Sequence, residues 1–337
     1  MRKIKIGSVG LGRLGEQHAK NISQRINGAE LTALCEKDEK KLHTIADRLG
    51  VEKRFTSFNE MLKLDELDAV VIVSPSGLHP EQISAALKAG KHVFSEKPLG
   101  VTVRECREAE AAVGKYSDKV FMLGFMRRFD PSYLYAKKKV DAGEIGRIIM
   151  FRSYGQDPEK FIGGAIAYAG HSGGEFLDMA VHDIDLARWF TGSEPETVYA
   201  IGGCYAHPEF AQYNDGDNVS ALMKFENESM VFLFAGRTAP HGYNVETEII
   251  GTKGILRIAS VPQKNHVEIL DNYGVRRECS ENFIERFADS YVNEIQEFVN
   301  CIQEGRKPEV TAHDGTRVSE IAYKCKESFE SGEMLRF

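Results

Sequence analysis

Short apolar runs alternate with helical stretches over the first 125 residues of the chain. The apolar runs lie at 3–10, 30–36, 68–75, 91–96 and 119–125. The helical stretches between them lie at 16–26, 38–49, 80–90 and 102–116. Strands that alternate with helices predict βαβ units and a parallel sheet covered on both faces. Asp38 and Thr102 stand at expected helix N-caps, and Gly50 and Gly90 at expected C-caps.

The pattern changes after about residue 127. Apolar runs at 147–155, 196–206, 218–226, 229–237 and 243–251 follow one another with short turns. This spacing predicts a large, mostly antiparallel sheet. One helix is expected near 174–190, after a glycine-rich linker at 156–172, and two more near 289–304 and 314–331. We therefore expect two domains, residues 1–126 and 127–337, and the length of 337 residues allows each its own core.

Composition narrows the possible partners. The net charge of −7 leaves no basic surface for a phosphate backbone, so a nucleic-acid partner is not expected. No apolar run reaches the roughly 20 residues needed to cross a membrane, and the N-terminus lacks the cleavage site of a signal peptide. The six cysteines form no C-x-x-C pair, which indicates reduced, mostly buried thiols and a cytoplasmic location.

The segment GLGRLG at 10–15 carries the first chemical signal. Gly10, Gly12 and Gly15 follow a strand and open a helix, in the G-x-G-x-x-G spacing of dinucleotide-binding loops. Arg13 and Leu14 complete the loop, whose helix N-terminus can bind a pyrophosphate. The first domain is thus predicted to be a Rossmann-type, doubly wound parallel sheet.

Glu36 ends the next predicted strand, 21 residues beyond Gly15. A carboxylate there can accept hydrogen bonds from both ribose hydroxyls and would repel a 2′-phosphate. NAD is therefore the expected cofactor rather than NADP, although the neighbouring Lys37 softens that repulsion.

Two further segments each allow two interpretations. Glu96 and Lys97 in HVFSEKPLG form either a solvated turn or part of a site at the carboxyl end of the sheet, where ligands of such sheets lie. Asp178 and His182 fall one helical turn apart, as either an exposed i,i+4 pair or a functional pair. Carboxylate and imidazole also ligate metals, but no H-E-x-x-H motif or cysteine cluster completes a metal site, so none is expected.

Taken together, these motifs resemble the glucose–fructose oxidoreductase/inositol dehydrogenase/rhizopine catabolism (Gfo/Idh/MocA) family of NAD(P)-dependent sugar dehydrogenases. The resemblance covers essentially the whole chain. It rests on GLGRLG (10–15), SEKPLG (95–100), DMAVH (178–182) and the closing segment 294–322. Within the family, GFMRRFDPSY (124–133) and FLDMAVHDIDLARWFTG (176–192) are most similar to inositol 2-dehydrogenases.

The resemblance implies roles for the matching residues. Lys97 would hold the substrate hydroxyl, His182 would be the general acid and base, and Asp178 would bind substrate and support that histidine. Arg127 and Tyr243 would contact the polyol. Ser74, Pro75 and His79 would run beneath the nicotinamide ribose, and Glu96 would contribute to cofactor binding at the nicotinamide end. The peptide before Pro98 is often cis in relatives.

The implied reaction is oxidation of a secondary hydroxyl on a cyclic polyol, myo-inositol to 2-keto-inositol, without a metal. The resemblance also implies an open second sheet whose exposed face forms dimers and often tetramers, so a homotetramer is expected. Other inositols or sugars remain open as substrates. Two other classes stay open as well, an NAD-dependent glycosidase and a non-catalytic dinucleotide sensor, although a sensor would typically lack the lysine or the histidine. The role of His171 in the linker is also open.

Overall fold

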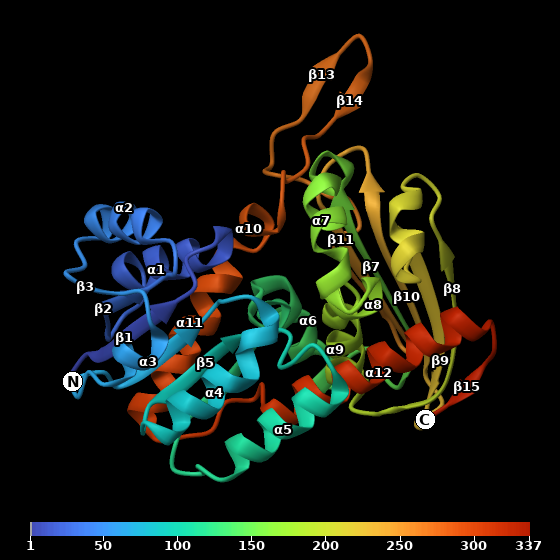
Figure 1. Cartoon of the computed structure of the whole chain (residues 1–337). Coiled ribbons are helices and arrows are strands. Elements are labelled where there is room, and N and C mark those ends of the chain that lie inside the picture. The colour runs from blue at the N-terminus through green and yellow to red at the C-terminus, as the bar shows by residue number, and fades with distance from the viewer. Residues whose placement is uncertain (1) are drawn as a thin grey trace. The chain divides into compact units, whose positions relative to one another are not determined.

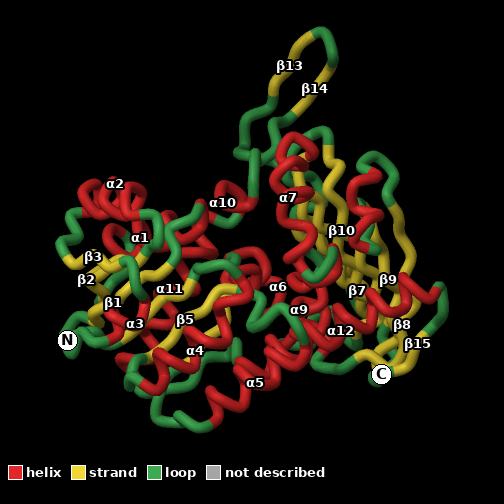
Figure 2. The backbone as a smooth tube through the Cα atoms, in the orientation of Figure 1, coloured by secondary structure: helices red, strands yellow, loops and turns green. Residues whose placement is uncertain are grey.

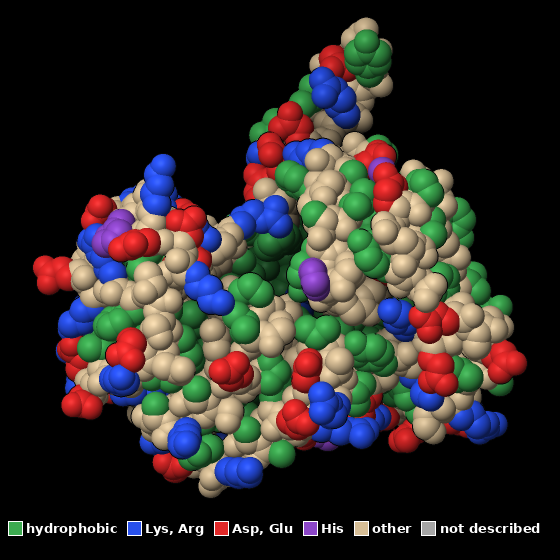
Figure 3. Space-filling model, in the orientation of Figure 1, with side chains coloured by type: hydrophobic (Ala, Val, Ile, Leu, Met, Phe, Trp, Pro, Cys, Tyr) green, Lys and Arg blue, Asp and Glu red, His purple; other side chains and the backbone are tan. Residues whose placement is uncertain are grey.

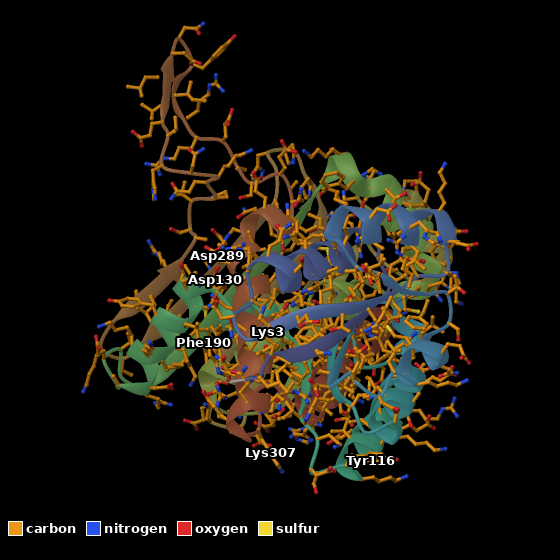
Figure 4. All side chains as sticks on the ribbon, turned by 90° about the vertical axis from the view of Figure 1, so that its left-hand side faces the viewer. Lys3, Tyr116, Asp130, Phe190, Asp289 and Lys307 are labelled. Carbon is orange, nitrogen blue, oxygen red and sulfur yellow. The ribbon has the colours of Figure 1, made fainter. Side chains whose placement is uncertain are left out.

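The computed structural model describes residues 2–337, and the chain forms two compact units. The first unit contains Met1–Phe129 and Asp289–Arg317, and the second contains Asp130–Ala288 and Val318–Phe337. Figure 4 labels Asp130 and Asp289, where the chain leaves the first unit and returns to it. A single boundary at 126/127 therefore does not describe the chain, because a late helix supplies apolar residues to the first core.

The first unit is built on a six-stranded parallel sheet in the order β3-β2-β1-β4-β5-β6 (Figure 1). Its strands are β1 (Ile4–Val9), β2 (Ala29–Cys35), β3 (Lys53–Phe55), β4 (Ala69–Ile72), β5 (His92–Glu96) and β6 (Phe121–Gly124). Its helices are α1 (Arg13–Gln24), α2 (Glu39–Leu49), α3 (Phe58–Leu62), α4 (His79–Lys88), α5 (Val103–Gly114) and α11 (Ala288–Glu304). This strand order is that of the doubly wound dinucleotide-binding fold, with helices on both faces of the sheet (Figure 2).

Local sequence signals explain where these helices begin and end. The side chain of Asp38 accepts a hydrogen bond from the Lys41 N–H, and Thr102 forms a capping box with Glu105. Gly50 closes α2 in the left-handed conformation, at a φ of +69°. The apolar faces of α1 and α11 pack on one side of the sheet, in a core made of residues such as Ile22, Phe94 and Phe298.

The second unit is built on a seven-stranded sheet in the order β12-β11-β7-β10-β9-β8-β15. Its strands are β7 (Ile148–Pro158), β8 (Pro195–Gly203), β9 (Asn218–Phe225), β10 (Met230–Ala239), β11 (Asn244–Gly251), β12 (Ile255–Ile258) and β15 (Leu335–Arg336). Its helices are α6 (Pro131–Asp141), α7 (Ile162–Ser172), α8 (Glu175–Asp178), α9 (Val181–Thr191) and α10 (Phe283–Arg286). The long helix α12 (Ala312–Ser331) belongs to both units. Neighbouring strands are antiparallel except β7 and β10, so the prediction of a mostly antiparallel sheet is confirmed.

The two faces of this second sheet differ sharply. Helices α8 and α9 contact one face, where the rings of Phe151 and Phe190 lie 6.0 Å apart. The alternating outward positions of β8 and β9 carry large apolar side chains that remain exposed, with Tyr199 at 43%, Ile201 at 55% and Leu222 at 55%. An antiparallel sheet that faces solvent usually carries polar residues there, so this open face is unusually apolar.

A hairpin of β13 (Ile269–Asp271) and β14 (Gly274–Arg276) forms a separate two-stranded sheet. Figure 3 shows it standing out from the surface, with basic, acidic and apolar side chains on it, and Figure 4 shows these side chains pointing outward. The short strands have no alternating apolar pattern, which explains why the sequence did not predict them.

The segment 156–190 differs most from the prediction. The expected linker at 156–172 continues β7 to Pro158 and then forms α7, and the single helix expected near 174–190 is two helices, α8 and α9. Gly173 and Gly174 have φ values of +82° and +99°, so the chain turns sharply between α7 and α8. Asp183 and Asp185 are buried, which rules out a solvated acidic face on α9.

Within residues 2–337, no helix combines the length and the apolar composition that crossing a membrane requires. All six cysteines are free, and four of them are buried, as their scattered spacing predicts.

Candidate functional site

The glycine loop has the shape that a bound dinucleotide requires. Gly10 has a φ of +82°, and a Cβ there would lie 2.6 Å from the Ser74 backbone nitrogen. A Cβ on Gly15 would lie 1.9 Å from the Gly10 carbonyl oxygen, so only glycine lets α1 pack on β1. A Cβ on Gly12 would meet nothing within 4 Å, which leaves room for a phosphate to approach the backbone.

The N-terminus of α1 faces this open position. The helix begins at Arg13 without a side-chain cap, so its first turn offers backbone N–H groups and the positive end of the helix dipole to an anion. Arg13 is exposed and Leu14 is half-buried. These features fit the pyrophosphate of a dinucleotide.

Glu36 follows β2 and stands beside the loop. Its Oε2 accepts hydrogen bonds from the Leu11 N–H at 2.9 Å and from Lys41 Nζ at 2.8 Å. Burial raises the pKa of Glu36, but these bonds and one from the Asp38 N–H outweigh burial and hold the pKa below its usual value. The carboxylate is thus ionised at neutral pH, and Lys41 holds it in place.

The loop after β4 is tied to the end of β5 by His79. The imidazole is buried, with Nδ1 2.8 Å from the Pro98 carbonyl oxygen and Nε2 2.9 Å from the Ser74 carbonyl oxygen. Burial lowers the pKa of His79, although both carbonyl contacts oppose that shift. His79 therefore links Ser74 and Pro75 to the cis Lys97–Pro98 peptide, and its ring is occupied by the protein itself.

Glu96 ends β5 at the carboxyl edge of the sheet, and Lys97 follows it directly. Lys97 is half-buried, whereas Glu96 is buried and its Oε1 lies 2.7 Å from His18 Nε2 on α1. Glu294 of α11 is fully buried on the other side, with Oε1 3.8 Å from the same nitrogen. Burial and the nearby Glu96 raise the pKa of Glu294 well above its usual value. The pair of charges at 96–97 is therefore not a solvated turn.

The three side chains of His18, Glu96 and Glu294 are close enough to be considered as metal ligands, since their candidate atoms lie within 4.8 Å of one another. Two ligands on one ion would be separated by roughly 3.0–3.4 Å, given bond lengths of about 2.1 Å. The 2.7 Å contact between His18 and Glu96 is instead a hydrogen-bond distance. The cluster thus contains a buried hydrogen bond between His18 and Glu96, with the carboxyl group of Glu294 beside it.

In the second unit, Asp178 is the last residue of α8 and His182 lies in the first turn of α9, and both are half-buried. The sequence missed two charged partners of this region. Arg237 of β10 donates from Nη2 to Asp178 Oδ2 at 2.6 Å and from Nε to Glu175 Oε2 at 2.5 Å. The sequence signal for Arg237 is weak, because a single arginine in a predicted strand does not reveal which helix it will face.

The other predicted site residues are placed as follows. Arg127 is buried in the short turn Met126–Phe129 that follows β6, in the first unit. Tyr243 is buried just before β11, where its N–H donates to the Ser280 carbonyl oxygen and its ring meets that of Phe287 edge-on at 6.2 Å. His171 is exposed in the last turn of α7.

Each unit therefore gathers its own part of the predicted site. The first brings the glycine loop, Glu36, Ser74 and Lys97 to the carboxyl ends of β1, β2, β4 and β5. In such sheets the ligand lies outside this edge, where the strand order reverses, here between β1 and β4. The second unit places Asp178 and His182 at the junction of α8 and α9.

Sequence and structure comparisons agree with this division. A family model described as "Oxidoreductase family, NAD-binding Rossmann fold" matches residues 4–125, and the model of the GFO/IDH/MocA C-terminal domain matches residues 133–257. The chain is 35% identical over 334 residues to scyllo-inositol 2-dehydrogenase (NAD(+)) from Bacillus subtilis (strain 168), covering 98% of this chain and 95% of that protein.

Two solved structures extend the comparison. The crystal structure of scyllo-inositol dehydrogenase from Lactobacillus casei with bound cofactor NAD(H) and scyllo-inositol matches with a TM-score of 0.96 and 46% identity, over 99% of each chain. The structure of myo-inositol 2-dehydrogenase from Lactobacillus plantarum matches with a TM-score of 0.97 and 39% identity, over 100% of each chain.

Proposed function

Because the chain belongs to the oxidoreductase family that combines an NAD-binding Rossmann fold with a GFO/IDH/MocA C-terminal domain, we propose that it oxidises one secondary hydroxyl of an inositol ring. The observation that carries this proposal is the full-length similarity to NAD-dependent inositol dehydrogenases, together with a glycine loop shaped for a dinucleotide. NAD, when bound, supplies the hydride acceptor.

The chain's own residues supply orientation and proton transfer in the proposed mechanism. His182 accepts the hydroxyl proton as a general base, a role that typically contributes 10²–10⁴-fold. Lys97 donates a hydrogen bond to the same oxygen and stabilises the negative charge that develops on it. Asp178 accepts hydrogen bonds from ring hydroxyls. The mechanism requires Lys97 of the first unit and His182 of the second to meet at one substrate carbon.

The proposal includes cofactor and epimer preferences. The ionised Glu36 beside the loop would repel a 2′-phosphate, which favours NAD over NADP. The sequence motifs suggested myo-inositol as substrate. The 46% identity to a scyllo-inositol dehydrogenase, against 39% to a myo-inositol 2-dehydrogenase, makes scyllo-inositol an equal candidate.

The test is a substrate panel followed at the absorbance band of NADH. Purified enzyme is mixed with NAD or NADP and with myo-inositol, scyllo-inositol, glucose, galactose or xylose. We expect the highest kcat/KM with NAD and an inositol. Turnover only with an open-chain or non-inositol sugar would refute the substrate assignment. Release of a sugar from a glycoside without net NADH would instead indicate a glycosidase.

We also propose that the enzyme is a homotetramer that assembles through the open face of the second sheet. Tyr199, Ile201 and Leu222 expose a contiguous apolar surface on neighbouring strands β8 and β9, which pair antiparallel. Such surfaces are uncommon on monomers and typical of interfaces.

A further inference from the structure

A buried ionic network lies behind Asp178, and the proposed chemistry does not use it. The side chain of Arg237 is 6% exposed, and it bridges Asp178, which is 24% exposed, and Glu175, which is 0% exposed. The backbone N–H of Glu175 in turn donates to Asp215 Oδ1 at 3.0 Å. The network thus connects the fully buried carboxyl group of Glu175 to the half-buried carboxylate of Asp178, which is expected to bind substrate.

The guanidinium group fixes the geometry of this network. Its Nε and Nη2 donate to two different carboxyl groups, and its planar fork holds both in one fixed relation. The ring of Phe210 stacks near the guanidinium, 5.8 Å from its centre, and limits its movement. Asp178 stands in a short helix of four residues, whose own hydrogen bonds hold it only weakly, so the ion pair with Arg237 contributes to fixing its side chain.

We propose that Arg237 and Glu175 are positioning residues that hold Asp178 in the orientation needed to bind the polyol, and that the protonation of Glu175 tunes this hold. The inference rests on the substrate-binding role given to Asp178 in the proposed function. Arg237 and Glu175 act through Asp178 and do not themselves touch the reacting atoms.

The charges around Glu175 explain why its protonation matters. Arg237 faces it from β10, Asp178 from α8, Asp215 from the segment before β9, and Asp157 from β7. On the α12 side, Lys326 Nζ lies 3.5 Å from the Gly173 carbonyl oxygen. Burial raises the pKa of Glu175 to about 8, against the opposing effect of Arg237. At pH 7 Glu175 is therefore largely protonated, and most of the attraction of Arg237 goes to Asp178.

Ionisation of Glu175 above this pKa changes how the guanidinium is shared. A second negative charge then lies beside Asp178, and its repulsion offsets part of the attraction between Arg237 and Asp178, which weakens the hold on Asp178. The proton leaves the carboxyl group of Glu175 to solvent, and no other bond changes. We expect polyol binding to weaken as the pH rises through about 8, while NAD binding, which uses the other unit, does not change.

Glu175→Gln is the sharpest test, because glutamine has nearly the shape of the protonated carboxyl group, keeps an acceptor oxygen and stays uncharged at every pH. The ratio of kcat/KM for the polyol in this variant to that in the wild type should be near one at pH 7. It should rise several-fold by pH 9, where only the wild type ionises. Because both proteins keep Asp178 and His182, the ratio isolates the change at Glu175. A ratio that stays constant across the pH range would overturn the proposal.

Arg237→Met and Arg237→Lys test the anchor itself. Arg237→Met should raise the KM for the polyol and lower kcat/KM by about 10- to 100-fold, the effect of losing one charged hydrogen bond. Arg237→Lys keeps the positive charge and should therefore recover part of this loss. The recovery should be incomplete, because one ammonium group cannot bind both carboxyl groups with the geometry of the guanidinium. The dissociation constant of NAD should be unchanged in both variants. An unchanged KM in Arg237→Met would refute the anchor.

Two controls separate the possible failures. Arg188→Met removes another arginine–carboxylate pair, in which Arg188 Nε lies 2.9 Å from Glu194 Oε1 at the far end of α9. It should lower the melting temperature without changing the KM or the pH ratio. Asp178→Asn should raise the polyol KM; if it does not, the proposed role of Asp178 fails. If Asp178→Asn raises the KM and Arg237→Met does not, only the inference fails. Should Arg237→Met not fold, the Glu175→Gln ratio decides.

Discussion

At the residue scale, the proposed mechanism assigns chemistry to one lysine and one histidine. Lys97→Ala and His182→Ala should each lower kcat by more than about 10²-fold, because one removes a donor to the developing charge and the other removes the base. Binding of NAD should survive in both variants. Stopped-flow detection of NADH gives kcat, and calorimetry with NAD gives the binding constant.

Matched controls for this prediction lie nearby in the chain. Lys88 in the last turn of α4 and His171 in the last turn of α7 are both exposed. Their alanine variants should keep near-normal turnover. Near-normal turnover in Lys97→Ala or His182→Ala would instead remove that residue from the mechanism, and the reaction would need another donor or base.

Individual residues of the candidate site differ in how well the sequence predicted them. The roles of Gly10, Gly12 and Gly15 follow from their spacing between a strand and a helix, because a tight turn and close backbone contact leave no room for a side chain at two of them. Arg237 and Glu175 could not be found in this way. They are 62 residues apart and meet only because a strand and a short helix pack together.

At the element scale, periodicity located every strand of the first sheet except the three-residue β3, because apolar runs separated by amphipathic helices have few other solutions. It failed at α7, whose three glycines are typical of a loop. A Cβ on one of them, Gly170, would lie 3.2 Å from the ring of Tyr213, so close packing against that segment explains the residue. Packing against neighbouring segments thus stabilises a helix at α7 even though glycine has a low helix propensity.

Helix α11 leads to a prediction about how the stability of the protein depends on pH. It places Glu294 in the first core, where burial and Glu96 raise its pKa well above its usual value. The folded protein then holds a proton that the unfolded chain releases above about pH 4.5, so this group makes stability fall as the pH rises. The slope is about 1.4 kcal/mol per pH unit, until the pH passes the folded-state pKa.

Glu294→Gln removes this proton linkage while keeping the shape of the side chain. The free energy of unfolding, measured by urea denaturation at pH 5, 6, 7 and 8, should fall less steeply with pH in the variant than in the wild type. Lys91→Met is the control, because Lys91 is buried at the start of β5 and its Nζ donates to the Leu64 and Leu67 carbonyl oxygens. It should lower stability without flattening that slope. Equal slopes for Glu294→Gln and the wild type would show that Glu294 is ionised in the fold.

At the scale of the whole molecule, the sequence predicted two domains but not where the chain crosses between them. The return of α11 to the first unit depends on which core accepts its apolar face, and Ile295, Phe298 and Val299 would suit either. The family resemblance implied an open sheet. The apolar character of its outer face emerges only when β8 and β9 are paired, because each strand alone shows ordinary alternation.

That outer face makes a prediction about assembly. Leu222 is 55% exposed on the central part of β9, between the neighbouring strands β8 and β10. Leu222→Asp would place a charge in the proposed interface. Burying a polar group without a partner costs roughly 2–7 kcal/mol, and burying an unpaired carboxylate costs more. Analytical ultracentrifugation should show a tetramer for the wild type and smaller species for this variant. Leu134→Asp, at an exposed leucine of α6, should leave the tetramer intact. A monomeric wild type, or a tetramer unaffected by Leu222→Asp, would show that the apolar face of the second sheet serves another partner or none.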